Sequence, residues 1–242
     1  MRMTATKAAL AALAGMVAII FAPGVQAGPE DSVYVVQAGT YDYLASPNFA
    51  GLVPAATVVK GQSLGLGTFD DLRGEFVLVG GKSYAVGTDG VPQAADLART
   101  TPFLQAISFR PEVSVPVPPG TTCAQTLSLV DQTAKTSDGV IAVRLRGTFT
   151  GLTTRSVPGF EPPYPTLTQA VSQQTTFDLS GRRAVLVGFR TGPDFAGTGA
   201  SGLHLHGVTS DRAAGGHVLS CIAGNDVQLS IQPSAGVAII GH

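Results

Sequence analysis

The sequence contains no tryptophan and few charged residues. Only 13% of its 242 residues are Asp, Glu, Lys or Arg, and the formal net charge is −1. A charge balance of this kind gives no long-range attraction to nucleic acid or to anionic lipid, so neither is an expected partner. Internal repeats, heptads and low-complexity tracts are also lacking, so repeat architectures and coiled coils are not expected.

Apolar runs long enough to span a bilayer are lacking beyond the N-terminus. The N-terminal run, residues 8–22, is itself short for a span. It follows the basic residues Arg2 and Lys7 and precedes Val25-Gln26-Ala27, which offers small residues at the positions that a signal peptidase reads. We therefore expect residues 1–27 to be a secretory signal that is cleaved after Ala27, and the mature protein to be periplasmic or secreted. An uncleaved membrane anchor is the alternative.

Cysteine is rare, since Cys123 and Cys221 are the two in the chain. In an oxidising compartment outside the cytoplasm such a pair can form a disulfide. The sequence gives no distance between the two residues, so two buried thiols are an equally acceptable prediction.

Glycine and proline, in contrast, are abundant. Thirty glycines and sixteen prolines are spread along the chain, which indicates many turns between short strands. The part after residue 27 has a little over two hundred residues, enough for one large domain or two closely packed lobes around a sizeable core.

The expected secondary structure is mostly β. The clearest local prediction is a β-hairpin from Glu75 to Val86 with Gly80-Gly81 at its tip, and the clearest helix covers residues 121–135 behind a Thr121 or Thr122 cap. The remaining predictions are strands at 33–37, 106–109 and 140–157, an edge or loop at 111–119, a weak helix or irregular stretch at 92–99, a helix at 166–174, a turn-linked strand pair at 177–181 and 184–190, and a final strand pair at 227–231 and 237–240.

Three of the four histidines lie within fourteen residues, as His204, His206 and His217. On a strand, His204 and His206 point to the same face with Cα atoms roughly 6.6 Å apart, which two imidazoles can bridge onto one metal ion. The polar residues 209–216 favour a turn that brings His217 up on a neighbouring strand. The spacing therefore predicts a three-histidine metal site with an open position, although three half-exposed histidines near a hairpin would show the same spacing.

The residues around the histidines favour the metal site over three half-exposed histidines. Leu203-His204-Leu205-His206, Asp211-Arg212 and Gly215-Gly216-His217-Val218 together resemble the zinc-binding core of the acetolactate decarboxylase family. A related core also occurs in the plants-and-prokaryotes-conserved domain of AT-hook DNA-binding proteins, so this stretch alone does not decide the function.

Two upstream motifs favour the decarboxylases. Gly-Thr-Phe-Asp-x-Leu-x-Gly-Glu at residues 67–75 is similar to the N-terminal signature of that family, in which the glutamate reaches the zinc site. By itself, a carboxylate such as Glu75 at the start of a strand is usually a solvated surface group. Gly147-Thr148-Phe149 followed by Arg155 resembles the second signature, in which the arginine is catalytic. Arg155 is therefore preferred over Arg144 and Arg146, which are expected to lie on the solvated face of a sheet.

The resemblance extends from Leu64 to Ile231 and implies a mixed α/β (α+β) fold. Its mixed or antiparallel sheets and few helices would form two lobes within residues 28–242, with a boundary near residue 158. The C-terminal sheet would hold the metal, and Glu75 would approach from the N-terminal one.

The implied reaction is the zinc-dependent decarboxylation of 2-acetolactate to acetoin and CO₂. Zn²⁺ would be held by His204, His206 and His217, with Glu75 as a further ligand. Arg155 and Glu75 would be the catalytic residues, and Thr68 would contact a substrate hydroxyl. The expected partners are the small-molecule substrate and, as one option, a second copy of the chain in a homodimer. No nucleic acid is expected, nor a membrane after cleavage of the signal.

One departure from the family pattern supports a second hypothesis. Family members generally continue beyond the third histidine into a tail that returns another glutamate to the site, whereas no acidic residue follows Asp226 here. The alternative is therefore an exported, non-catalytic homologue that binds a metal or a small molecule and has lost turnover.

The signal sequence is testable by intact mass spectrometry of protein recovered from the periplasm or the medium. We expect the mass of the chain that begins at Gly28, because the small residues up to Ala27 suit signal peptidase. A mass that includes residues 1–27 would indicate the uncleaved anchor instead.

Overall fold

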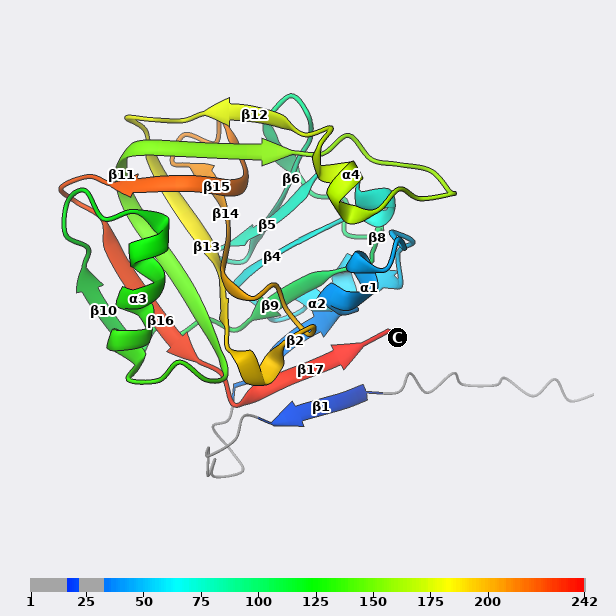
Figure 1. Cartoon of the computed structure of the whole chain (residues 1–242), viewed down its shortest axis with the longest axis horizontal. Helices are drawn as coiled ribbons and strands as arrows, with labels where there is room; N and C mark the ends of the chain where they lie inside the picture. The colour runs from blue at the N-terminus through cyan, green and yellow to red at the C-terminus, as the bar shows by residue number, and fades with distance from the viewer. Residues whose placement is uncertain (1–16, 22–32, 242) are drawn as a thin grey trace, which may run out of the picture.

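The computed structural model describes residues 17–21 and 33–241. These residues form two large β-sheets that pack on each other, with short helices around them (Figure 1). The fold is therefore mixed α+β with few helices, as the sequence predicts. Among the described residues, no helix has the length and apolar composition needed to cross a membrane.

The first sheet contains most of the described N-terminal half. In the described part of the chain its strands follow the spatial order β1 (Val17–Phe21), β17 (Gly236–Ile240), β2 (Val35–Ala38), β9 (Leu104–Ile107), β4 (Leu64–Thr68), β5 (Glu75–Val79), β6 (Lys82–Val86) and β7 (Pro92–Ala94). Neighbours are antiparallel, except that β17 runs parallel to β2. Strand β17 comes from the C-terminal end of the described chain, so the first sheet contains strands from both ends of it.

The second sheet is organised around one long strand. Its strands are β10 (Val113–Pro116), β16 (Gln228–Pro233), β11 (Val140–Ser156), β13 (Arg183–Thr191), β14 (Gly202–Thr209) and β15 (Gly215–Ala223), with β12 (Thr175–Asp178) beside β11. The first half of β11 pairs with β13 and β16, and its second half pairs with β15 and β12. Since β13, β14 and β15 also pair in turn, these strands and β11 close a ring. In Figure 1, β11 bends from a diagonal course beside β16 to a course along the top beside β15.

The helices are short and lie around the sheets. They are α1 (Tyr41–Ala45), α2 (Ala55–Val59), α3 (Cys123–Ala134), α4 (Leu167–Val171) and the 3₁₀ turns η1 (Asp70–Leu72) and η2 (Pro193–Phe195), and a small separate strand pair joins β3 (Val53–Pro54) to β8 (Thr100–Thr101). The longest of them, α3, begins with a capping box in which Thr122 and Gln125 satisfy each other's backbone N–H groups. The predicted helix at 121–135 is thereby confirmed.

The largest apolar cluster lies between the two sheets. It joins side chains of the first sheet, such as Leu66 and Val77, to side chains of the second, such as Val187 and Val208. A second cluster lies between α3 and the second sheet, and a third between α2 and the first. Burial of this apolar surface is what holds the sheets together. Strands β14 and β15 pack against β5 across this interface.

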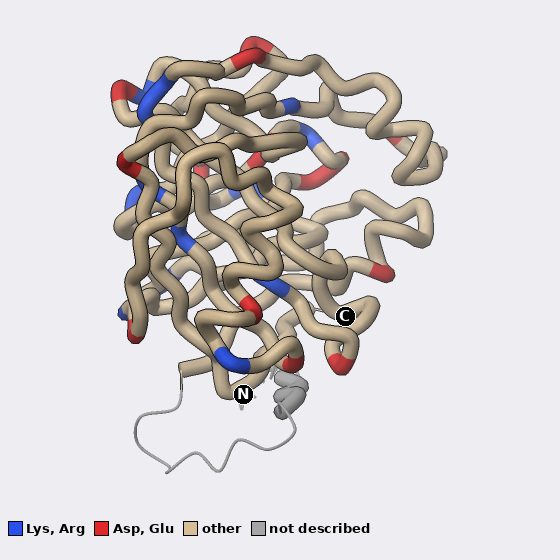
Figure 2. Tube along the Cα trace, turned by 60° about the vertical axis from the view of Figure 1, so that its left-hand side comes forward, with Lys and Arg blue, Asp and Glu red and all other residues tan. Residues whose placement is uncertain are grey.

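Charged residues add little to that core. Acidic and basic residues are scattered along the trace in Figure 2, and both signs occur on the same side of it. Ion pairs at the surface, such as Arg99 with Asp70 at 2.9 Å, are partly exposed to water. Pairs of this kind stabilise a fold by about 1 kcal/mol or less.

Several local predictions agree with the structure. The hairpin of β5 and β6 forms as expected, with Glu75 as its first residue, and β10 is an edge strand. The stretch 92–99 is not helical, since its start forms the edge strand β7. The helix predicted at 166–174 is shorter than expected, since α4 covers Leu167–Val171. Ala170 is its one fully buried side chain within the described residues.

The predicted pairing of strands was wrong in two places. Strands β12 and β13 both exist, but each pairs with β11 rather than with the other. The two last strands, β16 and β17, lie in different sheets. The reason is the same in both cases: alternation shows that a strand has a buried face but does not identify its neighbour. The chain passes between the sheets at residues 108–112 and again at 234–235. The lobe boundary expected near residue 158 stays a prediction.

The predicted signal sequence lies mostly outside the described residues. Its described part, β1, forms the outer strand beside β17. Cleavage after Ala27 stays a prediction.

Cys123 and Cys221 form a disulfide. Their Cα atoms are 5.1 Å apart, and 98 residues separate them in the sequence. The bond ties the first residue of α3 to β15, the strand that carries His217.

The double variant Cys123→Ser, Cys221→Ser should lower the free energy of unfolding by about 3 kcal/mol, because a cross-link over a long loop restricts the unfolded chain. Urea unfolding with and without reductant measures this. Reductant should bring the wild-type midpoint down to that of the variant and leave the variant unchanged. A wild-type midpoint that does not respond to reductant would contradict the bond.

Candidate metal centre and its pocket

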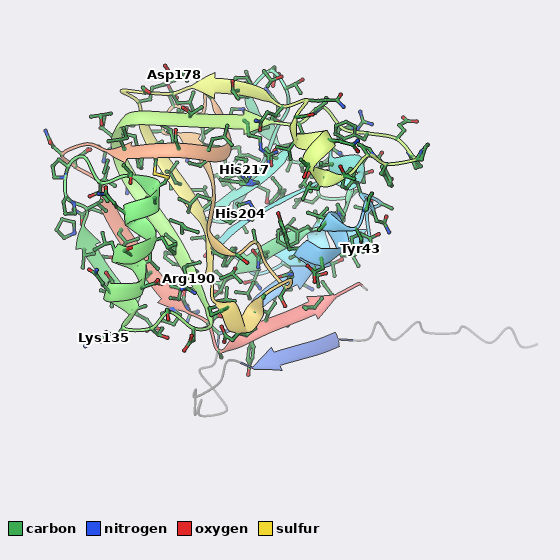
Figure 3. The ribbon with its side chains drawn as sticks, in the orientation of Figure 1. Tyr43, Lys135, Asp178, Arg190, His204 and His217 are labelled. Atoms are coloured by element: carbon green, nitrogen blue, oxygen red, sulfur yellow. A yellow bond between two sulfur atoms is a disulfide. The ribbon has the colours of Figure 1, made fainter. Side chains whose placement is uncertain are left out.

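Two neighbouring strands bring the three clustered histidines together. His204 and His206 alternate along β14 and face the same side, and His217 on β15 lies in register opposite His206. Figure 3 shows His204 and His217 close to each other in the middle of the molecule. The arrangement expected from the spacing is therefore present.

The imidazole nitrogens of the three rings converge on one point. His217 Nδ1 lies 3.2 Å from His204 Nε2 and 3.1 Å from His206 Nε2. One ring proton cannot serve both contacts at once, so lone pairs face each other in this cluster. Ligand atoms within 4.8 Å of one another can bind a single metal ion, and a cation at this point would satisfy all of them.

The tautomer of His206 suits this role. Its Nδ1 lies 2.9 Å from the carbonyl oxygen of Phe76, which can only accept a hydrogen bond. Nδ1 therefore carries the proton and Nε2 presents its lone pair to the cluster, as in metal sites where the second nitrogen of a histidine donates to a carbonyl. His204 differs, because its buried Nδ1 has no hydrogen-bond partner and its ring stacks on Phe103 with centroids 6.4 Å apart.

All three imidazoles are held in the neutral form. Burial, followed by the nearby charge of Arg155, lowers the pKa of His204 to about 3. Burial is also the largest cause that holds the pKa values of His206 and His217 well below the ordinary value of 6.5. Because only a neutral imidazole can donate its lone pair, the environment prepares the cluster for a metal ion at physiological pH.

A buried ion pair lies beside the histidines. Glu75 Oε1 accepts a hydrogen bond from Arg155 Nη1 at 2.7 Å, and Glu75 Oε2 is 3.5 Å from His206 Nε2. The side chains of Glu75 and Arg155 are 4% and 12% exposed. Burial outweighs the charge of Arg155 and raises the pKa of Glu75 to about 7. A carboxyl group with this pKa can both release and accept a proton near neutral pH.

The strands that carry Glu75 and Arg155 explain why these two side chains meet beside the histidines. Glu75 begins β5, in the first sheet, and Arg155 lies near the end of β11, in register with His217 of the second. Gly216, just before His217, has φ = 134°, and a Cβ there would lie 2.5 Å from the carbonyl oxygen of Arg155. Only glycine permits that close approach of β15 to β11.

Thr68 lies close to Glu75, because the two residues pair with each other across strands β4 and β5. Its hydroxyl donates to the carbonyl oxygen of Gly74 at 2.7 Å. What Thr68 offers a bound molecule is therefore its oxygen lone pairs. Arg144 and Arg146, in contrast, are absent from this group: Arg144 stacks over the ring of Phe109, and Arg146 is exposed.

One cavity of about 480 Å³ is lined by Thr68, Glu75, Arg155 and the three histidines. Its charged lining residues, in the described part of the chain, are Glu75 and Arg155. Most of the remaining wall is apolar and comes from α1, η1, the bend between β8 and β9, α4 and β14; its main contributors are Leu44, Leu72, Phe103, Leu167, Val171 and Leu203. A concave, largely apolar site with a few converging polar groups is the usual form of a small-molecule pocket.

Sequence reasoning missed three contributors to this site. The carbonyl of Phe76 orients His206, but a backbone group carries no residue-type signal. The pocket face of α4 was not predicted, because a five-residue helix has no clear periodicity. Phe103 stacks on His204, but a single aromatic residue in the sequence carries no signal for such a contact.

Fold and site together define a class: a protein of two packed β-sheets with a partly buried three-histidine cluster that can bind a metal ion in a small-molecule pocket. The model of the alpha-acetolactate decarboxylase family matches residues 35–240. Relatives named alpha-acetolactate decarboxylase are 32% identical in Methanosarcina mazei and 33% identical in Klebsiella aerogenes, covering 81% of this chain and 68% and 75% of theirs. The crystal structure of alpha-acetolactate decarboxylase from Bacillus subtilis superposes with a TM-score of 0.80 at 26% identity, covering 85% of this chain and 88% of that one.

The chain belongs to the alpha-acetolactate decarboxylase family. Members of such a family are carboxy-lyases, so the three-histidine cluster and its pocket belong to an enzyme.

His204→Ala should remove most of the bound metal, because it takes away one of the three converging nitrogens. Elemental analysis of protein purified after exposure to divalent metal measures this. The control is Arg146→Ala, which truncates an exposed side chain outside the pocket and should leave the metal content unchanged. Equal metal content in both variants would contradict the site.

Proposed function

We propose that the protein decarboxylates 2-acetolactate to acetoin and CO₂, with one zinc ion held by His204, His206 and His217. The observation that carries this proposal is the convergence, in one pocket, of the neutral imidazoles with the buried pair of Glu75 and Arg155. Membership of the alpha-acetolactate decarboxylase family supports the choice of substrate.

Zinc fits the donor set. Three neutral nitrogen ligands with an open position are a common arrangement of catalytic zinc, and neutral ligands leave the ion its full charge. When bound, the ion would supply a Lewis acid that stabilises the charge left on the hydroxyketone part of the substrate as CO₂ departs.

Arg155 would bind and orient the carboxylate of the substrate. Its Nη1 donates to Glu75, and the side chain also lines the pocket, where 12% of its surface is exposed. A guanidinium with further N–H groups in a largely apolar pocket is a strong binding site for a planar carboxylate. Arg155 would thus place the bond that breaks next to the histidine cluster.

Glu75 would handle the proton that completes acetoin. Its pKa of about 7 allows it to hold a proton and to release it to carbon near neutral pH. Its Oε2 lies 3.5 Å from His206 Nε2, so the same carboxylate is close enough to serve as a further zinc ligand. Thr68, whose hydroxyl proton is engaged by Gly74, would accept a hydrogen bond from the substrate hydroxyl.

A non-catalytic homologue that only binds a metal is less well supported. Such a protein has no evident need for both Glu75 and Arg155, and the structure contains both in the pocket. Export of the mature enzyme remains part of the proposal on the strength of the N-terminal sequence.

The function is tested by incubating the purified mature protein with 2-acetolactate and measuring acetoin. Turnover should disappear after removal of metal with a chelator and return when zinc is added. A zinc-loaded protein that forms no acetoin above background would rule the proposal out and favour the binding homologue.

Arg155→Lys should lower kcat/KM on the order of 100-fold while zinc is retained, because an ammonium group cannot reproduce the planar fork of the guanidinium. The matched control is Arg144→Lys, which makes the same change outside the pocket and should act like the wild type. If Arg155→Lys and Arg144→Lys were equally active, the role of Arg155 would be wrong.

Glu75→Gln should lower kcat on the order of 100-fold, because the amide keeps the shape of the side chain but can no longer carry the proton. Rates are compared for the folded, zinc-loaded fraction, since the substitution would leave Arg155 without its buried charged partner. A variant with the wild-type kcat would exclude Glu75 as the proton carrier.

A further inference from the structure

One wall of the pocket comes from a segment that makes few hydrogen bonds to the rest of the described chain. This segment, residues 158–172, follows β11 and ends with α4, whose residues Leu167, Thr168 and Val171 line the pocket. In Figure 1, α4 and α1 both lie at the end of the molecule away from α3. The capping box of α4, formed by Thr166 and Gln169, is internal to the segment.

Apart from the turn bonds that Gln173 and Gln174 donate back to Ala170 and Val171, the hydrogen bonds that join this segment to the rest of the described protein both end on Asp71. The backbone N–H of Phe160 donates to the carbonyl oxygen of Asp71 at 2.8 Å. The phenol of Tyr164 donates to Asp71 Oδ1, also at 2.8 Å. The rings of Phe160 and Tyr164 pack on Phe49, with centroids 6.2 and 5.2 Å away.

Asp71 itself lies in a strained turn. Asp71 and Leu72 have φ values of 60° and 56°, a left-handed conformation that aspartate tolerates and leucine disfavours. The turn is held on its other side by a hydrogen bond of 2.8 Å from the Asp71 N–H to the carbonyl of Phe49. Strained backbone of this kind persists where its surroundings hold it, and it is common next to functional sites.

The turn that contains Asp71 also adjoins residues that line the pocket. Leu72 is buried and lines the pocket, and Glu75 follows three residues later. Asp71 therefore joins two parts of the pocket wall, Leu72 and α4, at a point just before the carboxylate.

On the basis of the proposed function, we propose that Tyr164 is a positioning residue for 2-acetolactate: its hydrogen bond to Asp71 holds α4 in place as the wall that confines the substrate. A small hydroxy keto acid does not fill a cavity of about 480 Å³, which is within the range for much larger ligands. A fixed apolar wall restricts such a substrate to one orientation. Burial, and after it the hydrogen bond to Asp71, raises the pKa of Tyr164 to about 12, so the phenol remains the donor.

Tyr164→Phe removes the hydroxyl and keeps the ring against Phe49. Hydrogen–deuterium exchange should show the α4 amides exchanging about tenfold faster in this variant, because a latch of one hydrogen bond is lost. Exchange in β14 and β15, and the zinc content, should stay at the wild-type level. This measurement does not require that the protein be active.

The kinetic readout separates positioning from general stability. Tyr164→Phe should raise KM for 2-acetolactate about fivefold to tenfold and change kcat less than twofold, because α4 contacts the bound substrate but lies apart from the reacting groups. The matched control is Tyr43→Phe, whose hydroxyl bonds to the carbonyl of Ala50 and does not line the pocket. It should keep the wild-type KM and the wild-type exchange of α4.

A conservative change at the partner tests the same bond from its other end. Asp71→Asn retains an acceptor oxygen and tolerates the left-handed backbone, so its KM should lie within about twofold of wild type. Asp71→Ala loses the acceptor and should behave like Tyr164→Phe or worse.

Wild-type exchange of α4 in Tyr164→Phe would overturn the proposal, as would faster exchange with an unchanged KM or a loss confined to kcat. An inactive wild-type protein would contradict the proposed function instead, and the exchange of α4 would then decide the latch by itself.

Discussion

The buried contact between Glu75 and Arg155 is the constraint on which the site depends. A carboxylate placed in the interface of two sheets is costly unless a partner charge meets it there. Glu75 enters from β5 of the first sheet and Arg155 from β11 of the second, and they meet at 2.7 Å. Removal of either partner from such a pair typically costs about 3–5 kcal/mol, because the other is left buried and unpaired. The docking of the sheets and the chemistry of the pocket are therefore linked by one contact.

The histidine cluster depends on the same interface. Strand β5, which supplies Glu75, also supplies the Phe76 carbonyl that fixes the tautomer of His206. The burial that keeps the imidazoles neutral comes from the packing of β14 and β15 against β5. In the described site, neutral ligands and a balanced ion pair bring no net charge when Glu75 is ionised. A dication would therefore act on an anionic substrate without being offset by the protein.

Much of this could be predicted from local sequence. The alternation of His204 and His206 predicted that both side chains face the same side of a strand. The turn residues after them predicted the return of the chain to His217, and Gly80-Gly81 predicted the hairpin that begins at Glu75. Long-range pairing could not be predicted, because an apolar alternation fits any sheet edge. The bend of β11 let one strand pair with β12, β13, β15 and β16, and β17 crossed to the other sheet. The meeting of Glu75 with Arg155, eighty residues later, was expected from the family motifs rather than from either local pattern.

The energetics of the pair also bear on whether the site is catalytic. Replacing a buried ion pair with apolar side chains of similar volume is often neutral or stabilising, so stability alone gives little reason to bury Glu75 and Arg155. A pair that serves only to hold the sheets together could be apolar, as Val77 and Val157 in the cluster between the sheets are. Under the proposed function, a carboxyl group with a pKa of about 7 and a guanidinium that line one pocket beside three neutral imidazoles suit a proton transfer next to a bound carboxylate. The cost of the buried charges is thus better explained by the reaction than by the fold.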